Sequence, residues 1–164
     1  FSQNTNLLLA FLRDHNTARS VLDVSNDLYA MFGRETYCRL FPVILTDRGS
    51  EFSNPVPIEQ DENDELRSLV FYCNPSAPYQ KGGIEVAHEL VRRVLPKGKS
   101  FDDLQQEDID LMLSHINSYK RGKLNSRSAY QLFDFIYGDD ILPKLNIREI
   151  EANDIVLSPK LLKK

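Results

Sequence analysis

Two acidic residues, Asp47 and Glu85, occupy the positions in this chain from which metal-dependent chemistry would start. Asp47 follows the apolar run Phe41 to Leu45, which is typical of a strand buried on both faces, and Glu85 lies in the first turn of a predicted helix. Ligands in α/β folds bind beyond the carboxyl ends of strands, so we expect both acids to line one edge of a sheet. Two carboxylates directed at one point repel each other unless a cation lies between them. Mg²⁺ or Mn²⁺ takes oxygen ligands of this kind.

The pattern around these acids predicts an α/β domain. Strand-like runs are Leu7 to Leu12, Phe41 to Leu45 and Leu69 to Cys73, and the polar stretch Glu51 to Ser68 predicts a surface loop. A helix is expected over Thr17 to Phe32, capped by Asn16 and closed by Gly33. Another is expected to open after Gly82-Gly83 and to run to Leu95, with Ile84, Val91 and Leu95 as its core stripe. Two later helices are predicted from apolar spacing at Ile109, Met112, Leu113 and Ile116 and at Ala129, Leu132, Phe133 and Ile136.

Several short motifs place these elements in a known context. The main ones are the run Thr46-Asp47-Arg48-Gly49-Ser50-Glu51-Phe52, the run Pro78 to Gly82 before Glu85, and the run Leu95-Pro96-Lys97-Gly98 after Glu85. Two segments downstream, His115 to Arg121 and Ser128 to Phe133, add to them. Together they resemble the integrase catalytic core of a DDE-type transposase, most closely the insertion-sequence transposases of the "IS thirty" family.

The resemblance implies a fold, a reaction and a site. The expected fold is a ribonuclease H-like integrase core, an incomplete mixed sheet flanked by helices, over residues 1–137, with a C-terminal helical extension or tail over residues 138–164 that we expect to be an extended arm. The implied activity is DNA transposition by metal-dependent strand cleavage and strand transfer, with Asp47 and Glu85 as catalytic residues and ligands of Mg²⁺ or Mn²⁺. The partners would be transposon ends and target DNA, in a homo-oligomer when the protein is full length, and the location would be the bacterial cytoplasm, at the nucleoid.

The chain departs from the family pattern in three places. Arg48 and Ala87 stand where the family often has Asn, and an Arg beside Asp47 could compete for its carboxylate. No residue before Asp47 matches the first catalytic Asp, and Asp14 follows a predicted strand at a turn where the family has no ligand. We therefore expect a fragment that lacks the first strands and any upstream DNA-binding domain, and that is inactive alone.

Charge is distributed unevenly along the chain. The net charge is −4, but binding of nucleic acid depends on local fields. One group of basic residues lies close to Glu85 in the sequence. A second group consists of Lys120, Arg121, Lys123 and Arg127 and contains no acidic residue. The residues predicted to contact DNA are Lys81, His88, Arg92, Arg93, Lys97 and Lys99. Solvated helix ends, and for His88 a surface or core histidine, are the alternative interpretation.

Composition favours a domain with a real core and no membrane partner. The chain has 164 residues, of which 41% are apolar and 27% charged, without a run of the length that a membrane span needs. Cys38 and Cys73 lack metal-ligand spacing, so reduced thiols are expected. Two other functions remain open: a non-catalytic remnant that folds or binds DNA weakly, and a ribonuclease H-like nuclease, because the same carboxylate geometry also hydrolyses strands.

Overall fold

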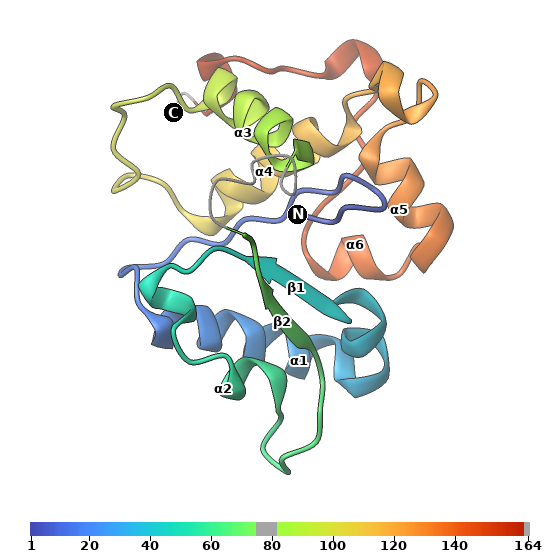
Figure 1. Ribbon diagram of the computed structural model, residues 1–164. Coiled ribbons are helices and arrows are strands. Elements are labelled where there is room, and N and C mark those ends of the chain that lie inside the picture. Colours follow the sequence, from blue (N-terminus) through green and yellow to red (C-terminus); the bar gives the residue numbers. More distant parts are fainter. Residues whose placement is uncertain (75–81, 163–164) are drawn as a thin grey trace. The chain divides into compact units, whose positions relative to one another are not determined.

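A computed structural model describes residues 1–74 and 82–162 of the protein (Figure 1). The chain divides into two compact units. One, called the sheet unit below, is Arg13–Gln80; the other, called the helical unit, combines Phe1–Leu12 with Lys81–Lys164. Each unit is described by itself.

The sheet unit has the α/β composition expected from the sequence. Its elements are α1 (Ala18–Leu40), β1 (Val43–Thr46), the 3₁₀ turn η1 (Ser50–Phe52), α2 (Val56–Glu59) and β2 (Leu69–Tyr72). The two strands pair in parallel, with Val43 opposite Leu69 and Thr46 opposite Tyr72. Two of the three predicted strands, Phe41 to Leu45 and Leu69 to Cys73, are confirmed to within two residues. The sheet is parallel and two-stranded over the described residues instead of mixed.

Helix α1 begins one residue later and continues further than predicted. Its N-cap is Thr17, whose hydroxyl accepts a hydrogen bond from the Ser20 N–H at 3.2 Å, whereas the predicted cap, Asn16, accepts one from Arg13. Gly33 has φ 73° and ψ 165°, a backbone conformation that favours glycine. It therefore ends the first helical segment as predicted, and a second segment then runs on to Leu40.

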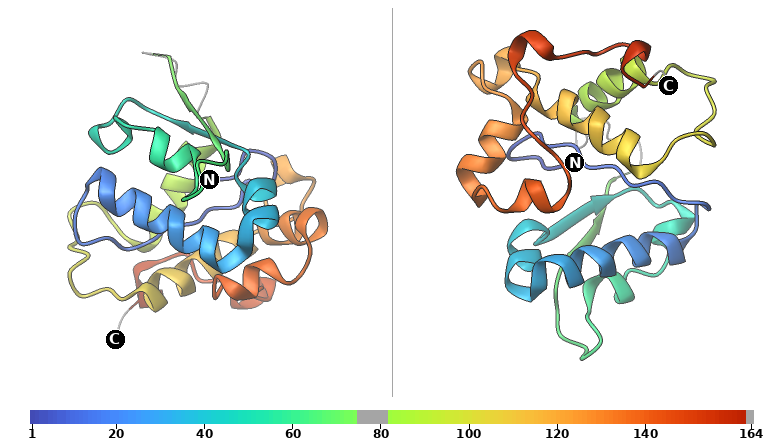
Figure 2. Two further views of the ribbon diagram at one scale, coloured as in Figure 1. Left: turned by 90° about the horizontal axis from the view of Figure 1, so that it is seen from below. Right: turned by 180° about the vertical axis from the view of Figure 1, so that it is seen from behind.

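Only one face of the two-stranded sheet is buried. In Figure 2, α1 lies along one face of β1 and β2, and the alternate strand residues Thr46 and Val70 are 6% and 9% exposed. Residues of the other parity are exposed: Val43, Leu45, Leu69 and Phe71. The prediction of a strand buried on both faces was therefore wrong, because β1 alternates between covered and uncovered positions.

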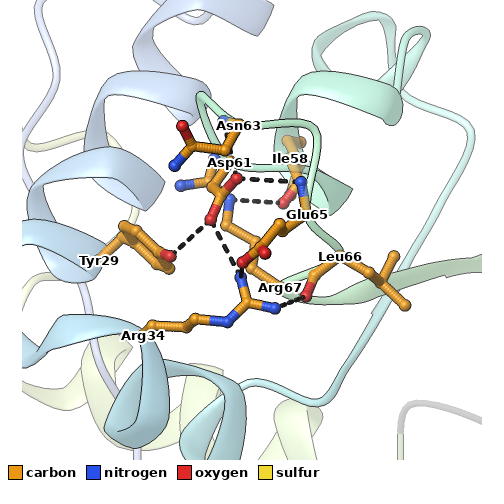
Figure 3. Close-up of polar contacts among 8 residues, drawn as sticks. All are labelled: Tyr29, Arg34, Ile58, Asp61, Asn63, Glu65, Leu66 and Arg67. Atoms are coloured by element: carbon orange, nitrogen blue, oxygen red, sulfur yellow. Dashed lines mark hydrogen bonds and ion pairs between the residues drawn. The ribbon is translucent and has the colours of Figure 1, made fainter.

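The stretch Glu51 to Ser68 is more structured than the predicted surface loop. It contains η1, α2 and a turn that is held by Asp61 (Figure 3). Asp61 Oδ2 accepts hydrogen bonds from the Tyr29 hydroxyl at 2.8 Å and from Arg34 at 3.0 Å, and Oδ1 accepts two from backbone N–H groups of its own turn. The hydrogen bond from Tyr29 is the largest influence that lowers the pKa of Asp61 below its usual value. These contacts attach the turn to α1.

A buried arginine completes the sheet unit. Arg67 is 4% exposed, and its guanidinium donates to the carbonyl oxygens of Pro57 and Ile58 and to Asn26 Oδ1. The guanidinium carbon lies 5.1 Å and 5.6 Å from the ring centroids of Tyr29 and Tyr37. A buried charge needs such partners, because an unpaired cation in the interior is strongly destabilising.

The helical unit is built around one central helix. Its elements are α3 (Gly82–Val94), α4 (Gln106–Ser118), η3 (Gly122–Leu124), α5 (Ala129–Tyr137), α6 (Ile141–Lys144), η4 (Ala152–Asp154) and η5 (Pro159–Leu162). Helix α4 packs against α3, α5 and η5, and residues 112–118 of α4 are all buried. The predicted core positions Ile109, Met112, Leu113 and Ile116 are confirmed, each at most 4% exposed.

The predicted strand from Leu7 to Leu12 is not a strand. The backbone N–H of Leu8 donates to Asn117 Oδ1 at 2.9 Å, and Asn117 Nδ2 donates to the Leu8 carbonyl at 2.8 Å. Gln106 of α4 binds the backbone of Leu12 and Ala10 in the same way. Side-chain amides of α4 thus form the hydrogen bonds with the backbone of this extended segment that a neighbouring strand would otherwise form.

The C-terminal segment packs into the helical unit instead of extending from it. Its apolar side chains Ile141, Leu142, Leu145 and Ile147 are at most 7% exposed. Its backbone N–H groups at Arg148, Ile150 and Val156 donate to side chains of α4. The expectation of an extended arm was therefore wrong over the described residues 138–162, because burial of these side chains fixes the segment.

Among the residues that the structure describes, no helix is long and apolar enough to cross a membrane.

Candidate active site

Asp47 lies where the sequence predicted, directly after the carboxyl end of β1, and it is exposed. The ladder between the strands continues to this point, because the Cys73 N–H donates to the Thr46 carbonyl at 2.8 Å. The Tyr72 hydroxyl donates to the Phe52 carbonyl and so ties the segment after Asp47 to β2. The backbone that carries Asp47 is therefore held on both sides.

The turn after Asp47 contains Gly49, whose backbone is extended with φ −63° and ψ 154°. A Cβ atom there would lie 2.6 Å from Glu51 Oε2, so a larger residue would only move the end of the flexible Glu51 side chain. Arg48 is exposed, as is Asp47. The motif from Thr46 to Phe52 thus forms a strand-to-turn unit that exposes Asp47 and Arg48 and leaves Glu51 half-buried.

Glu85 is confirmed in the first turn of α3 and is exposed. A carboxylate at this position interacts favourably with the N-terminal end of the helix dipole. The core stripe of α3 consists of Ala87, Leu90 and Val94, each at most 3% exposed. Of the predicted stripe Ile84, Val91 and Leu95, Leu95 is buried as predicted, whereas Ile84 and Val91 are only half-buried, so the prediction was wrong for these two positions.

Burial explains one departure from the family pattern. Ala87 is 0% exposed, so an Asn there would have to bury its amide in the core. Close packing also fixes the start of α3, because a Cβ atom at Gly83 would lie 2.6 Å from a ring carbon of Phe1. Small residues at 83 and 87 therefore let the helix that carries Glu85 pack closely.

The basic residues predicted to contact DNA are arranged along α3 and the segment after it. His88, Arg92, Arg93, Lys97 and Lys99 are all exposed. Lys81 lies outside the described residues, as does the rest of the run before Gly82. The described members therefore form an exposed basic group on the helix that carries Glu85 and on the segment after it.

Asp47 and Glu85 belong to different units, so the predicted meeting of their carboxylates stays a prediction. Within residues 1–74 and 82–162, no three His, Cys, Asp or Glu side chains are grouped so that they could hold a metal ion. Cys38 and Cys73 form no disulfide. What the structure confirms is the local setting of each acid: one at a strand end, one at a helix start.

Two residues of the segment His115 to Arg121 have structural roles that sequence reasoning did not assign. Asn117 is 0% exposed and holds Leu8, as described above. His115 is 6% exposed, and its Nδ1 accepts a hydrogen bond from the Val156 N–H at 3.1 Å. Burial, and secondarily the charge of Arg148, lowers the pKa of His115. Their place on the buried face of an amphipathic helix was the pattern that could have revealed them.

Sequence comparison connects the chain to proteins that move DNA. A transposase for insertion sequence element IS1086 of Cupriavidus metallidurans is 35% identical over 63 residues, which cover 38% of this chain and 19% of that protein. A transposase for IS4351 of Bacteroides fragilis is 28% identical over 94 residues, or 57% and 28% of the two chains. Transposase InsI for IS30A of Escherichia coli is 26% identical over 65 residues, or 40% and 17%.

The predicted resemblance to insertion-sequence transposases is therefore confirmed. The matched segments span less than a third of the length of each of these relatives. No model of a protein family matches the chain, and no solved structure matches it.

Proposed function

We propose that this chain forms part of the catalytic core of a DDE-type transposase, which cleaves DNA and joins its ends with the aid of Mg²⁺ or Mn²⁺. The observation that carries the proposal is the placement of Asp47 at the end of β1 and of Glu85 in the first turn of α3, each within its motif. The transposase relatives support it.

The fold that we propose for the complete core is ribonuclease H-like. Parallel β1 and β2 would be two strands of its larger sheet, and α1 would be one of the helices that flank it. The uncovered apolar residues on the outer face of β1 and β2 support this proposal, because a strand in a complete core is covered on both faces. The exposed acid at the strand end agrees with the general position of ligand sites in α/β folds.

Asp47 and Glu85 have the donor chemistry that Mg²⁺ takes, since both present carboxylate oxygens to solvent. Bound Mg²⁺ would supply positive charge to the phosphate oxygens that gain charge during phosphoryl transfer. In this proposal Asp47 and Glu85 hold the metal, and Arg92, Arg93 and Lys97 position the DNA backbone through its phosphates.

Because the relatives are several times longer than the matched segments, we propose that the 164-residue chain alone is inactive. Two carboxylates hold divalent ions more weakly than three, so the scissile phosphate would not be aligned. A non-catalytic remnant that binds DNA weakly is a second candidate. Ala87 favours it, because the core around this residue is packed for a side chain without polar atoms.

The proposal is tested by metal binding and by activity. We expect calorimetric titration with Mn²⁺ to show weak binding that is lost in Asp47→Asn and in Glu85→Gln. Asp27→Asn removes an exposed acid of α1 and serves as the matched control. Equal heats for the parent chain and both site variants would place any bound metal elsewhere and overturn the site.

Activity is measured as nicking of supercoiled plasmid and as insertion of a labelled oligonucleotide with a free 3′-hydroxyl. We expect no product from this chain and product from a longer protein that contains it, provided that Glu85 is intact. Activity of the short chain that survives Glu85→Gln would contradict both the assignment of the site and the need for further segments.

A further inference from the structure

The loop between α4 and α5 carries a concentration of positive charge that the proposed active site does not use. Residues 119–128 contain Lys120, Arg121, Lys123 and Arg127 and no acidic residue. Lys120, Lys123 and Arg127 are exposed. The chain as a whole has a net charge of −4, so this loop is a local exception to an acidic background.

The loop is closed and held by its own backbone. The Arg121 N–H donates to the Arg127 carbonyl at 3.1 Å, and N–H groups at Leu124, Asn125 and Arg127 donate back to carbonyls within the loop. The 3₁₀ turn η3 occupies its centre. The cations are therefore attached to a fixed frame, and less conformational entropy is lost when they bind a ligand.

Two neighbouring residues of the loop have positive φ values. Asn125 has φ 52° and Ser126 has φ 60°, both in the left-handed region that L-residues other than Asn and Asp rarely adopt. Backbone strain of the kind seen at Ser126 is concentrated at binding and catalytic sites. In this loop it makes the sharp reversal that brings Arg127 back beside Arg121.

Arg121 has hydrogen-bonding capacity that the described part of the protein does not fill. Its Nε and Nη2 atoms are buried and have no hydrogen-bond partner. A buried donor without an acceptor is destabilising, so an oxygen acceptor that reached these atoms would gain more here than at an ordinary surface arginine. Among the residues described, none of the three exposed cations of the loop has an ion pair with an acid.

Tyr119 precedes the cations and is 39% exposed. Arginine, lysine and tyrosine side chains are among those that bind phosphate oxygens of the DNA backbone. Such contacts do not depend on the DNA sequence. They are measured as the salt dependence of the binding affinity, because each neutralised phosphate releases condensed counterions.

We propose that the loop of residues 119–128 is a second DNA-binding surface, which holds the phosphate backbone of duplex DNA through Lys120, Arg121, Lys123 and Arg127. This inference rests on the proposed function for its ligand, but its residues are separate from Asp47, Glu85 and the basic group of α3. Its part in the reaction is to position DNA.

The test is binding of the 164-residue chain to a fluorescein-labelled 30-base-pair duplex, followed by fluorescence anisotropy from low to physiological salt. We expect Lys120→Ala combined with Lys123→Ala to weaken binding roughly tenfold at low salt and to reduce the slope of log K against log salt by about 2, since each phosphate contact contributes about 0.9. The loss should be the same for duplexes of unrelated sequence. Lys144→Ala removes an exposed cation of α6 and is the matched control, with binding unchanged.

Arg121→Lys tests the guanidinium without removing charge, and we expect a severalfold loss because lysine lacks the planar fork. Thermal unfolding of each variant separates a loss of binding from a loss of folding, and the two-lysine variant keeps the proposal testable if Arg121→Lys fails to fold. An unchanged salt slope in the two-lysine variant would overturn the proposal. So would equal losses in that variant and in Lys144→Ala.

The same assay separates this inference from the proposed function. If changes at Arg92 and Arg93 abolish binding and changes in the loop do not, the proposed function stands and the loop is not a DNA surface. If the loop variants lose affinity while the α3 variants and the Mn²⁺ titrations show no effect, the loop proposal stands and the active-site proposal fails.

Discussion

Asp47 and Glu85 are supported in different ways by the two units of the molecule. In the sheet unit, Asp47 extends from a two-stranded ladder that α1 covers on one face, while apolar residues of the other face are exposed. In the helical unit, Glu85 lies on a helix that packs against α4, and buried polar side chains of α4 form hydrogen bonds with backbone groups of distant segments. The difference teaches that the backbone carrying an acid can be held either by strand pairing or by helix packing.

The largest effect on stability, and so the strongest test of this comparison, is expected from a substitution at Asn117. In Asn117→Ala the Leu8 N–H and carbonyl would both be buried without a partner, at about 1–3 kcal/mol each. We expect the free energy of unfolding of the helical unit to fall by about 2–5 kcal/mol. Urea unfolding followed by circular dichroism measures it. Asn153→Ala, at an exposed position in η4, is the control, and an equal loss there would show that the clamp on Leu8 is not stabilising.

In the sheet unit the corresponding residue is Arg67. Arg67→Met removes the donors that bind the carbonyls of Pro57 and Ile58, and we expect a loss of about 2–3 kcal/mol in the free energy of unfolding. Arg19→Met removes an exposed cation of α1 that pairs with Asp23, and its effect should be within about 0.5 kcal/mol. If the two variants were equally stable, the buried guanidinium would not be a main support of this unit.

A smaller, pH-dependent effect is expected at His115. Burial lowers its pKa in the folded protein below the value of 6.5 that applies to the unfolded chain, so the unfolded state binds more protons between the two values. Stability from this residue is therefore present above pH 6.5 and lost progressively as the pH falls through the folded-state pKa.

Thermal unfolding between pH 5 and pH 7.5 measures this effect. The pH dependence should be weaker in His115→Gln and unchanged in His88→Gln, which alters an exposed histidine. A pH dependence that is identical in His115→Gln and in the parent chain would show that other groups are responsible.

The smallest effect on folding is expected on the exposed face of the sheet. Phe71 is 54% exposed, so Phe71→Thr should change the free energy of unfolding by about 0.5 kcal/mol or less and reduce self-association. Val70→Ala, at the neighbouring buried position, should cost about 2 kcal/mol. Unfolding experiments and analytical ultracentrifugation compare the two. Similar losses of unfolding free energy in Phe71→Thr and Val70→Ala would show that the face of the sheet that carries Phe71 is covered. The sheet unit would then resemble the helical unit in having its apolar residues buried.

Local patterns predicted a large part of this protein. Both strands, the closure of a helical segment at Gly33, the core positions of α4 and the placement of Asp47 and Glu85 follow from apolar spacing and turn residues. These features depend on interactions between residues close in sequence, which is why they can be inferred without the fold. The prediction of a strand over Leu7 to Leu12 was wrong because its outcome depends on distant residues. Apolar residues in an extended segment do not reveal which groups form hydrogen bonds with its backbone.

The sequence by itself defined the candidate site at the level of residue type, as two acids within motifs and a group of basic residues near Glu85. Only the tertiary structure decided that Asn117 and Gln106 of α4 replace a strand beside residues 7–12, that Arg67 is buried among carbonyls and rings, and that the C-terminal segment packs on α4. Each of these contacts joins residues far apart in the chain. Their partners are set by which polar groups burial leaves unsatisfied, and that is a property of the folded molecule rather than of any local segment.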